Sequence, residues 1–137
     1  MNDGRRLEFR FPADPAMLRQ VREQVRSASL ACGCCEKTVA ELVIAINEAC
    51  MNIIQHAYKG DCSGEIILEI LNNGGELEFQ LRDFAAPVDL ARIKPRDLDD
   101  LRPGGLGTHF IHEIMDDCVY GHLGDRGNYL RMKKKIS

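Results

Sequence analysis

The chain has 137 residues, 45% of them hydrophobic and 28% charged, which is typical of a soluble globular protein with a single core. Its net charge of −3 argues against direct nucleic-acid binding, and no apolar run approaches the roughly 20 residues of a membrane span. The first residues lack the apolar stretch of a secretory signal, so we expect a cytoplasmic protein with one domain over residues 1–137.

The first half of the chain predicts one strand and two helices. Residues 5–11 alternate apolar and charged side chains, as a half-buried strand does. Asp14 and Pro15 then form a helix start signal, and apolar spacing of three to four residues continues that helix to about residue 30. A longer helix is predicted over residues 36–58, where an apolar stripe points to the core.

Cys32, Cys34 and Cys35 cluster between these two helices, and the chain has six cysteines in all. A zinc site of the finger or ribbon type needs a second ligand pair at suitable spacing, and the other three cysteines are isolated. We therefore expect buried, reduced thiols. A thiol sensor that uses Cys32 and Cys35 stays open as an alternative.

The second half begins with a predicted hairpin, in which residues 64–71 and 76–83 flank an Asn-Asn-Gly-Gly turn. Residues 84–103 contain three prolines and little periodicity, so we expect a long loop of the kind that forms a functional lid. A helix over about 105–115 follows.

A second hairpin, formed by residues 117–123 and 128–136, completes the chain. Antiparallel hairpins beside segregated helices predict an α+β fold. We expect a two-layer sandwich in which a mostly antiparallel sheet is covered on one face by three helices.

Two polar residues of the long helix, Glu48 and Asn52, are four positions apart and therefore project from one side of it. This polar stripe runs beside the core stripe. Such a pattern is typical of a helix that lines a cleft, and equally of an amphipathic helix at a protein surface.

An acidic residue, Asp83, continues the apolar face of the strand formed by residues 76–83. A buried carboxylate needs a hydrogen-bond donor, which an adenine amino group could supply. A turn-capping aspartate is the alternative.

A glycine-rich segment from Gly104 to Thr108 leads directly into the predicted helix of residues 105–115. Glycines at a helix N-terminus let backbone N–H groups approach a phosphate, and the helix dipole favours negative charge there. The chain has neither a P-loop motif nor a Rossmann glycine motif within a βαβ unit.

Three blocks, in this order, resemble the Bergerat-fold (GHKL) ATPases, in the version found in bacterial anti-sigma-factor serine kinases. Residues 48–58 (EACMNIIQHAY) are similar to that family's asparagine box, residues 83–89 (DFAAPVD) to its aspartate–glycine box, and residues 103–107 (PGGLG) to its second glycine box. Residues 128–132 (NYLRM) resemble its closing strand. The likeness covers nearly the whole chain.

The resemblance implies a role for each matching residue. Asn52 would ligate Mg²⁺, Glu48 would be the general base, and Asp83 would accept a hydrogen bond from the adenine amino group. The remaining nucleotide-binding positions would be Ala85, Gly104, Gly105, Leu106, Gly107 and Thr108. Lys94, Arg96 and Arg102 in the lid are further candidates for phosphate contacts, with solvated loop side chains as the alternative.

One position departs from the family. The family has a glycine two residues after the aspartate, where this chain has Ala85. If that position needs a positive φ or close contact with adenine, the alanine costs about 1 kcal/mol or more of binding free energy. His56, inside the asparagine box, is expected to serve packing or capping and not catalysis.

The resemblance implies an ATP- and Mg²⁺-dependent serine/threonine protein kinase. Such a kinase binds a sigma factor and phosphorylates a STAS-domain anti-anti-sigma protein, and it commonly forms a homodimer. The alternative is a non-catalytic nucleotide-binding module that acts only by protein binding. No direct nucleic-acid or membrane partner is expected.

Overall fold

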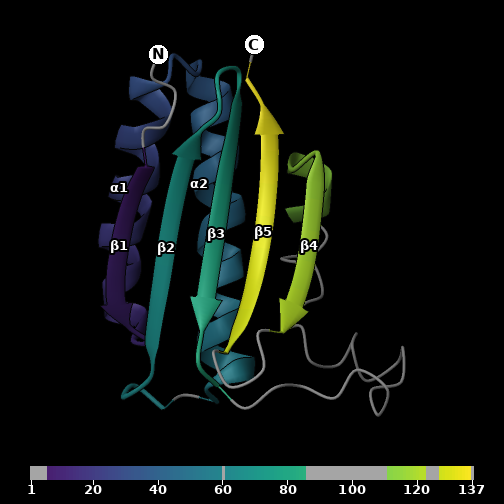
Figure 1. The fold of residues 1–137 in the computed structure, drawn as a ribbon. Coiled ribbons are helices and arrows are strands. Elements are labelled where there is room, and N and C mark those ends of the chain that lie inside the picture. Colours follow the sequence, from purple (N-terminus) through teal and green to yellow (C-terminus); the bar gives the residue numbers. More distant parts are fainter. Residues whose placement is uncertain (1–5, 60, 86–110, 123–126, 137) are drawn as a thin grey trace.

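Figure 1 shows the fold in a computed structural model, which describes residues 6–59, 61–85, 111–122 and 127–136. The described residues contain a five-stranded sheet in the order β1-β2-β3-β5-β4, with every neighbouring pair antiparallel. The strands are β1 (Arg6–Pro12), β2 (Glu65–Asn72), β3 (Glu76–Asp83), β4 (Asp117–His122) and β5 (Asn128–Lys135). Both predicted hairpins and the α+β class are confirmed.

The helices lie together on one face of the sheet (Figure 1). A 3-10 turn, η1 (Pro15–Met17), leads into α1 (Leu18–Ala31), and α2 (Glu36–Asn52) continues as a π-helical turn, η2 (Ile53–Ala57). The predicted start signal is confirmed, because Asp14 Oδ1 accepts from the N–H of Ala16 at 3.0 Å. Of the helix predicted over about 105–115, residues 111–115 are described, and of these residues 111–114 are helical.

The core lies between the helices and the inner face of the sheet. Period-2 alternation directs one set of strand side chains inward, where they meet the apolar stripes of α1 and α2. Fully buried members include Val21, Leu42, Ile46, Leu68, Phe79, Leu81 and Met132. One helix of the described residues, Glu36–Ala57, is long and apolar enough to cross a membrane, and its buried side chains belong to this core.

The hairpin turn between β2 and β3 has the predicted chemistry. Gly74 and Gly75 adopt φ values of +69° and +96°, which favour glycine because it has no Cβ. Asn72 Oδ1 accepts from the N–H of Gly74 at 3.0 Å, so the asparagine side chain closes the turn.

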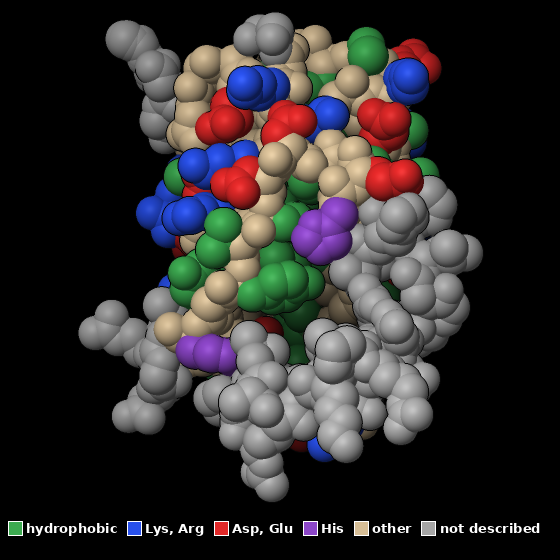
Figure 2. Space-filling view, turned by 90° about the vertical axis from the view of Figure 1, so that its right-hand side faces the viewer, with side chains coloured by type: hydrophobic (Ala, Val, Ile, Leu, Met, Phe, Trp, Pro, Cys, Tyr) green, Lys and Arg blue, Asp and Glu red, His purple; other side chains and the backbone are tan. Residues whose placement is uncertain are grey.

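The side of the molecule at the β4 edge is divided by polarity (Figure 2). Charged side chains gather at the upper end, where β4 begins, and Asp116 Oδ2 accepts from the N–H of Lys135 at 2.6 Å. Hydrophobic side chains are exposed lower down, and Tyr120 of β4 is 58% exposed. The charged end lies opposite the end at which β3 finishes with Asp83 (Figure 1).

The expectation of buried thiols is wrong for two of the six cysteines. All six are free, but Cys35 and Cys62 are exposed, whereas Cys34 and Cys50 are buried. The Cys35 thiol lies 3.3 Å from the Thr38 hydroxyl, and this hydrogen bond lowers the pKa of Cys35. Burial raises the pKa of Cys50 to about 12, so that thiol stays protonated and packs as an apolar side chain.

Candidate nucleotide site

The C-terminal end of α2 carries Glu48 and Asn52. Buried Ala49 and Cys50 hold this part of the helix against the core, whereas Glu48 and Asn52 are half-buried on its side. The end of α2 and the end of β3 lie at the same end of the molecule (Figure 1). The fold therefore brings the predicted base and metal ligand to the end of the sheet that holds Asp83.

The helix changes form directly after Asn52. The N–H of Tyr58 donates to the carbonyl of Ile53 at 3.0 Å, five residues back, which is the π-helical pattern. The continuous α-helix predicted to residue 58 is therefore wrong in its last turn. The wider turn places one more residue per turn, a distortion that often marks functional sites, and apolar spacing alone does not reveal it.

His56 lies in this π-helical turn. Its Nε2 atom is buried and has no hydrogen-bond partner among the described residues. Burial lowers the pKa of the imidazole, which favours the neutral form. This agrees with the expected packing role.

Tyr58, at the end of the π-helical turn, connects α2 to two strands. Its hydroxyl accepts from the N–H of Phe84 and donates to the carbonyl of Glu65, each at 2.7 Å. Its ring lies where a Cβ on Gly64 would sit, only 2.3 Å from that position, so Gly64 leaves room for it. The tyrosine thus holds the helix end against both the start of β2 and the residue that follows Asp83.

Asp83 is 5% exposed and continues the buried face of β3, as predicted. One carboxylate oxygen, Oδ1, accepts from the N–H of Ala85 at 3.1 Å and from Nδ2 of Asn128 at 2.8 Å. No described residue donates to the other oxygen, Oδ2. Burial raises the pKa of Asp83, while the hydrogen bonds from Asn128 and Ala85 oppose that rise.

Ala85 is buried and lies beside Asp83. Lys59 is the single non-glycine residue with a positive φ among the described residues, so Ala85 has an ordinary backbone conformation. The strain expected from replacing a glycine that needs positive φ is therefore absent. Close contact between the alanine methyl group and a bound base is the remaining reason for a cost.

Three functional candidates were not predicted as such: Tyr58, Asn128 and His122. Asn128 pairs with Asp83 across β3 and β5, and His122 pairs with Asn128 across β4 and β5. Tyr58 and Asn128 stand inside segments that resemble the family. Their roles depend on strand register and on the shape of a turn, which the sequence pattern does not specify.

The predicted phosphate-binding segment and most of the predicted lid lie outside the described residues. These positions are Lys94, Arg96, Arg102, Gly104, Gly105, Leu106, Gly107 and Thr108. Of the nucleotide-site residues, the described part contains Glu48, Asn52, Asp83 and Ala85.

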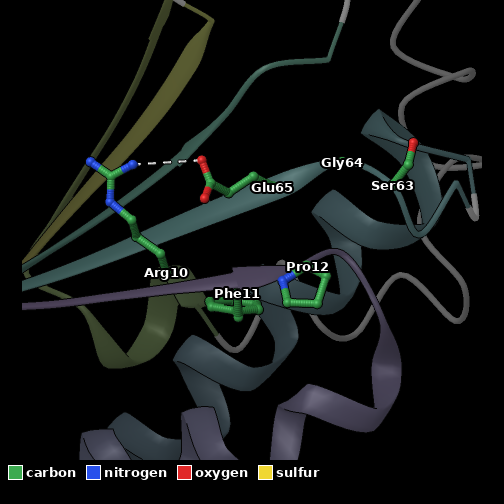
Figure 3. Close-up of a pocket in the computed structure, with 6 residues that line it drawn as sticks. All are labelled: Arg10, Phe11, Pro12, Ser63, Gly64 and Glu65. Carbon is green, nitrogen blue, oxygen red and sulfur yellow. Dashed lines mark ion pairs between the residues drawn. The ribbon is translucent and has the colours of Figure 1, made fainter.

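A shallow pocket of about 290 Å³ lies between the end of β1 and the start of β2 (Figure 3). Its lining residues are Arg10, Phe11, Pro12, Ser63, Gly64 and Glu65, and the guanidinium of Arg10 lies 3.7 Å from the Glu65 carboxylate. The pocket contains none of the predicted site residues.

The described donor and acceptor groups suit a Mg²⁺·ATP complex. Asp83 Oδ2 offers a hydrogen-bond acceptor at a buried position, which suits an exocyclic amino group. The amide oxygen of Asn52 is the hard ligand that Mg²⁺ prefers, and Glu48, one helical turn before it, is a carboxylate that can accept a proton.

Comparison with known proteins places this arrangement in a family. The model of the histidine kinase-like ATPase domain matches residues 11–134. The serine-protein kinase RsbW of Bacillus cereus (strain AH187) is 34% identical over 143 residues, which cover 96% of this chain and 85% of that protein. RsbW of Listeria monocytogenes serotype 4a (strain HCC23) is 30% identical over 140 residues, covering 96% and 88%.

A solved structure of the RsbU and RsbW domains of a Mycobacterium tuberculosis protein has the same fold. It matches with a TM-score of 0.70 and 20% identity over 96% of this chain, which spans 32% of that solved chain. The fold, the family model and the sequence identities agree. The chain therefore belongs to the histidine kinase-like ATPase domain family, within its anti-sigma-factor serine kinases.

Proposed function

We propose that this protein is an ATP- and Mg²⁺-dependent serine/threonine protein kinase. In this role it binds a sigma factor and phosphorylates a STAS-domain anti-anti-sigma protein on a serine or threonine hydroxyl. The observation that carries the proposal is the placement of Glu48 and Asn52 at the end of α2, which Tyr58 ties to the segment that follows Asp83. The proposed general base, the proposed metal ligand and the carboxylate proposed to contact adenine therefore lie at one end of the fold.

Each of these residues has a separate task in the proposed reaction. Glu48 accepts the proton of the attacking hydroxyl, and Asn52 holds the Mg²⁺, which neutralises phosphate charge when bound. Asp83 accepts from the adenine amino group and so fixes the orientation of the nucleotide. The predicted segment Gly104–Thr108, with Leu106 between its glycines, supplies backbone N–H groups for the phosphates.

Glu48→Gln tests the catalytic part of the proposal. The amide cannot accept the hydroxyl proton, so we expect phosphoryl transfer to a STAS-domain substrate to fall by about 10²- to 10⁴-fold while Mg²⁺·ATP affinity stays within a few-fold of wild type. Glu41→Gln is the matched control, because Glu41 is also half-buried on the same helix, two turns earlier. Transfer at the wild-type rate by the Glu48→Gln protein would show that Glu48 is not the base.

The second candidate is a non-catalytic module that sequesters a partner and uses nucleotide only as a structural ligand. Ala85 stands where the family has a glycine, and a methyl group that hinders adenine binding would favour this second function. Nucleotide affinity alone does not separate the two functions, but phosphoryl transfer does. Wild-type protein that binds Mg²⁺·ATP yet never phosphorylates a STAS-domain protein with which it co-purifies would favour the module.

We further propose that residues 1–137 form one domain, and that the protein is cytoplasmic, forms a homodimer and binds neither nucleic acid nor a membrane directly. The family relationship supports the sigma factor and the STAS-domain protein as partners. Purification from the native cell with identification of the bound proteins tests the partners, and light scattering of the purified protein tests the dimer. A monomer at micromolar concentration would contradict that part of the proposal.

A further inference from the structure

The pairing of three strands places a row of polar side chains at their ends. This row includes Asp83, the residue proposed to contact the adenine base. Asp83 ends β3 opposite Asn128, the first residue of β5, and Asn128 lies opposite His122, the last residue of β4. Asn128 Nδ2 donates to Asp83 Oδ1 at 2.8 Å, and Asn128 Oδ1 lies 2.7 Å from Nδ1 of His122. Three side chains from three strands are thereby linked in one row.

The hydrogen bonds determine how the Asn128 amide is oriented. Its Nδ2 atom also donates to the carbonyl of Ala85 at 3.2 Å, and a carbonyl oxygen can only accept. The nitrogen must therefore face Asp83 and Ala85, and Oδ1 must face His122. Since Oδ1 can only accept, we assign the proton of the His122 ring to Nδ1.

This orientation leaves Asp83 with one oxygen for a ligand. Oδ1 already accepts from Ala85 and Asn128, and no described residue donates to Oδ2. A purine with an amino group at C6 can donate to Oδ2. A purine with an oxo group at that position presents lone pairs to a carboxylate, which is repulsive.

We propose that Asn128, held in place by His122, is a positioning and specificity-determining residue that presents Asp83 as a single acceptor and selects a 6-amino purine nucleotide. The inference rests on the proposed function, because it needs Asp83 to contact the base. It goes beyond that function because it assigns the choice of a 6-amino purine to Asn128 of β5 and His122 of β4, which do not themselves contact the purine. Neither residue is proposed to touch the reacting phosphate.

The test compares three nucleotides by calorimetric titration with Mg²⁺ present. They are ATP, GTP and the ATP analogue with hydrogen in place of the C6 amino group. For wild type we expect ATP to bind more tightly than both others. For Asn128→Ala we expect the preference for ATP over the deaminated analogue to fall about tenfold, because Asp83 loses the donor that orients it.

His122→Ala should change the same preference in the same direction, but less, since the asparagine can still reach Asp83. The side chain of His122 is exposed, so this variant remains informative if Asn128→Ala does not fold. Asn73→Ala and His112→Ala are matched controls at exposed positions, and both should keep the wild-type preference.

The outcomes separate the two proposals. If Asn128→Ala, or His122→Ala should the former not fold, weakens ATP and the deaminated analogue equally, the role of Asn128 is structural and the inference is overturned while the proposed function stands. Wild-type protein that binds ATP and the analogue equally would show that Asp83 does not read the amino group, which overturns the inference and that part of the proposed function. Wild-type protein that binds no nucleotide would overturn both.

Discussion

Asp83 is a carboxylate in a buried position, and this has a consequence for stability that is separate from nucleotide binding. Burial raises its pKa above the ordinary value of 3.8, so the folded protein holds the proton more tightly than the unfolded chain. The unfolded state therefore binds fewer protons in this range. The contribution of Asp83 to the free energy of unfolding is greatest below pH 3.8 and falls as the pH rises through the folded-state pKa.

Asp83→Asn should separate stability from function. The amide oxygen can still accept from Ala85 and Asn128, and the buried charge is gone, so we expect the free energy of unfolding at pH 7 to rise by about 1 kcal/mol. The amide nitrogen of the new asparagine then faces the adenine amino group, and because both groups are hydrogen-bond donors, no hydrogen bond forms between them. Mg²⁺·ATP affinity should therefore fall by roughly 10- to 100-fold.

Urea unfolding at several pH values and calorimetric titration measure the two effects. Asp61→Asn is a useful comparison, because hydrogen bonds from Ser63 lower the pKa of exposed Asp61, so its contribution to stability is lost on acidification. The two substitutions should thus change the pH dependence of stability in opposite senses. A loss of stability at pH 7 in Asp83→Asn would show that the charge is favourable where it lies.

Among the elements, the junction of α2, β2 and β3 depends on the Tyr58 hydroxyl. In Tyr58→Phe the ring still packs over Gly64, but the N–H of Phe84 and the carbonyl of Glu65 lose their partner. We expect a loss of about 1–3 kcal/mol in the free energy of unfolding and weaker Mg²⁺·ATP binding, because Phe84 follows Asp83 directly.

Tyr129→Phe is the matched control for this change. The Tyr129 ring also occupies the place of a glycine Cβ, at Gly121, and the described part of the chain offers its hydroxyl no hydrogen-bond partner. Equal losses in the two variants, measured by urea unfolding, would show that the two hydrogen bonds of the Tyr58 hydroxyl are not what makes Tyr58→Phe less stable.

The start of β5 depends on Gly127 in two ways. Its φ is +98°, and a Cβ there would lie 2.0 Å from the carbonyl oxygen of Asp83. Gly127→Ala must therefore move β5 away from β3, and we expect a loss of more than about 2 kcal/mol in the free energy of unfolding together with weaker ATP binding.

Gly74→Ala isolates the backbone term, because Gly74 also has a positive φ, of +69°, but nothing lies within 4 Å of its Cβ position. We expect it to cost only about 1 kcal/mol and to leave nucleotide affinity unchanged. If both alanine variants unfold at the same urea concentration, the contact with Asp83 is not what requires glycine at position 127.

At the scale of the whole molecule, hydrophobic periodicity predicts the elements well because core formation determines them. Strands that alternate Leu77, Phe79 and Leu81 inward leave little choice of face, and the turn at Gly74 permits only a hairpin. Local distortions are different. The π-helical turn after Asn52 keeps the same apolar spacing as an α-helix, so the pattern contains no sign of it.

The candidate site was predictable to the same extent. Helical spacing places Glu48 and Asn52 on one side of a helix, and strand alternation places Asp83 on an apolar face, but only the resemblance to the family implies their roles. The partners of Asp83 do not, because Asn128 comes next to it only through the pairing of β3 with β5, 45 residues away in sequence. Long-range register of this kind needs the three-dimensional fold.

Nucleotide binding should stabilise the whole domain, since its proposed ligands come from α2, β3 and the segment before residue 111. Nucleotide at 100 times its Kd adds about 2.7 kcal/mol to the free energy of unfolding, which for a chain of 137 residues corresponds to a rise in Tm of roughly 10 °C.

Asn52→Ala removes the proposed Mg²⁺ ligand, so the part of the rise in Tm that EDTA abolishes in wild type should be missing in this variant. Asn47→Ala, on the same helix, should keep it. Tm is measured by thermal denaturation with and without EDTA. If the EDTA-sensitive rise in Tm is of full size in Asn52→Ala, the metal is bound by other residues.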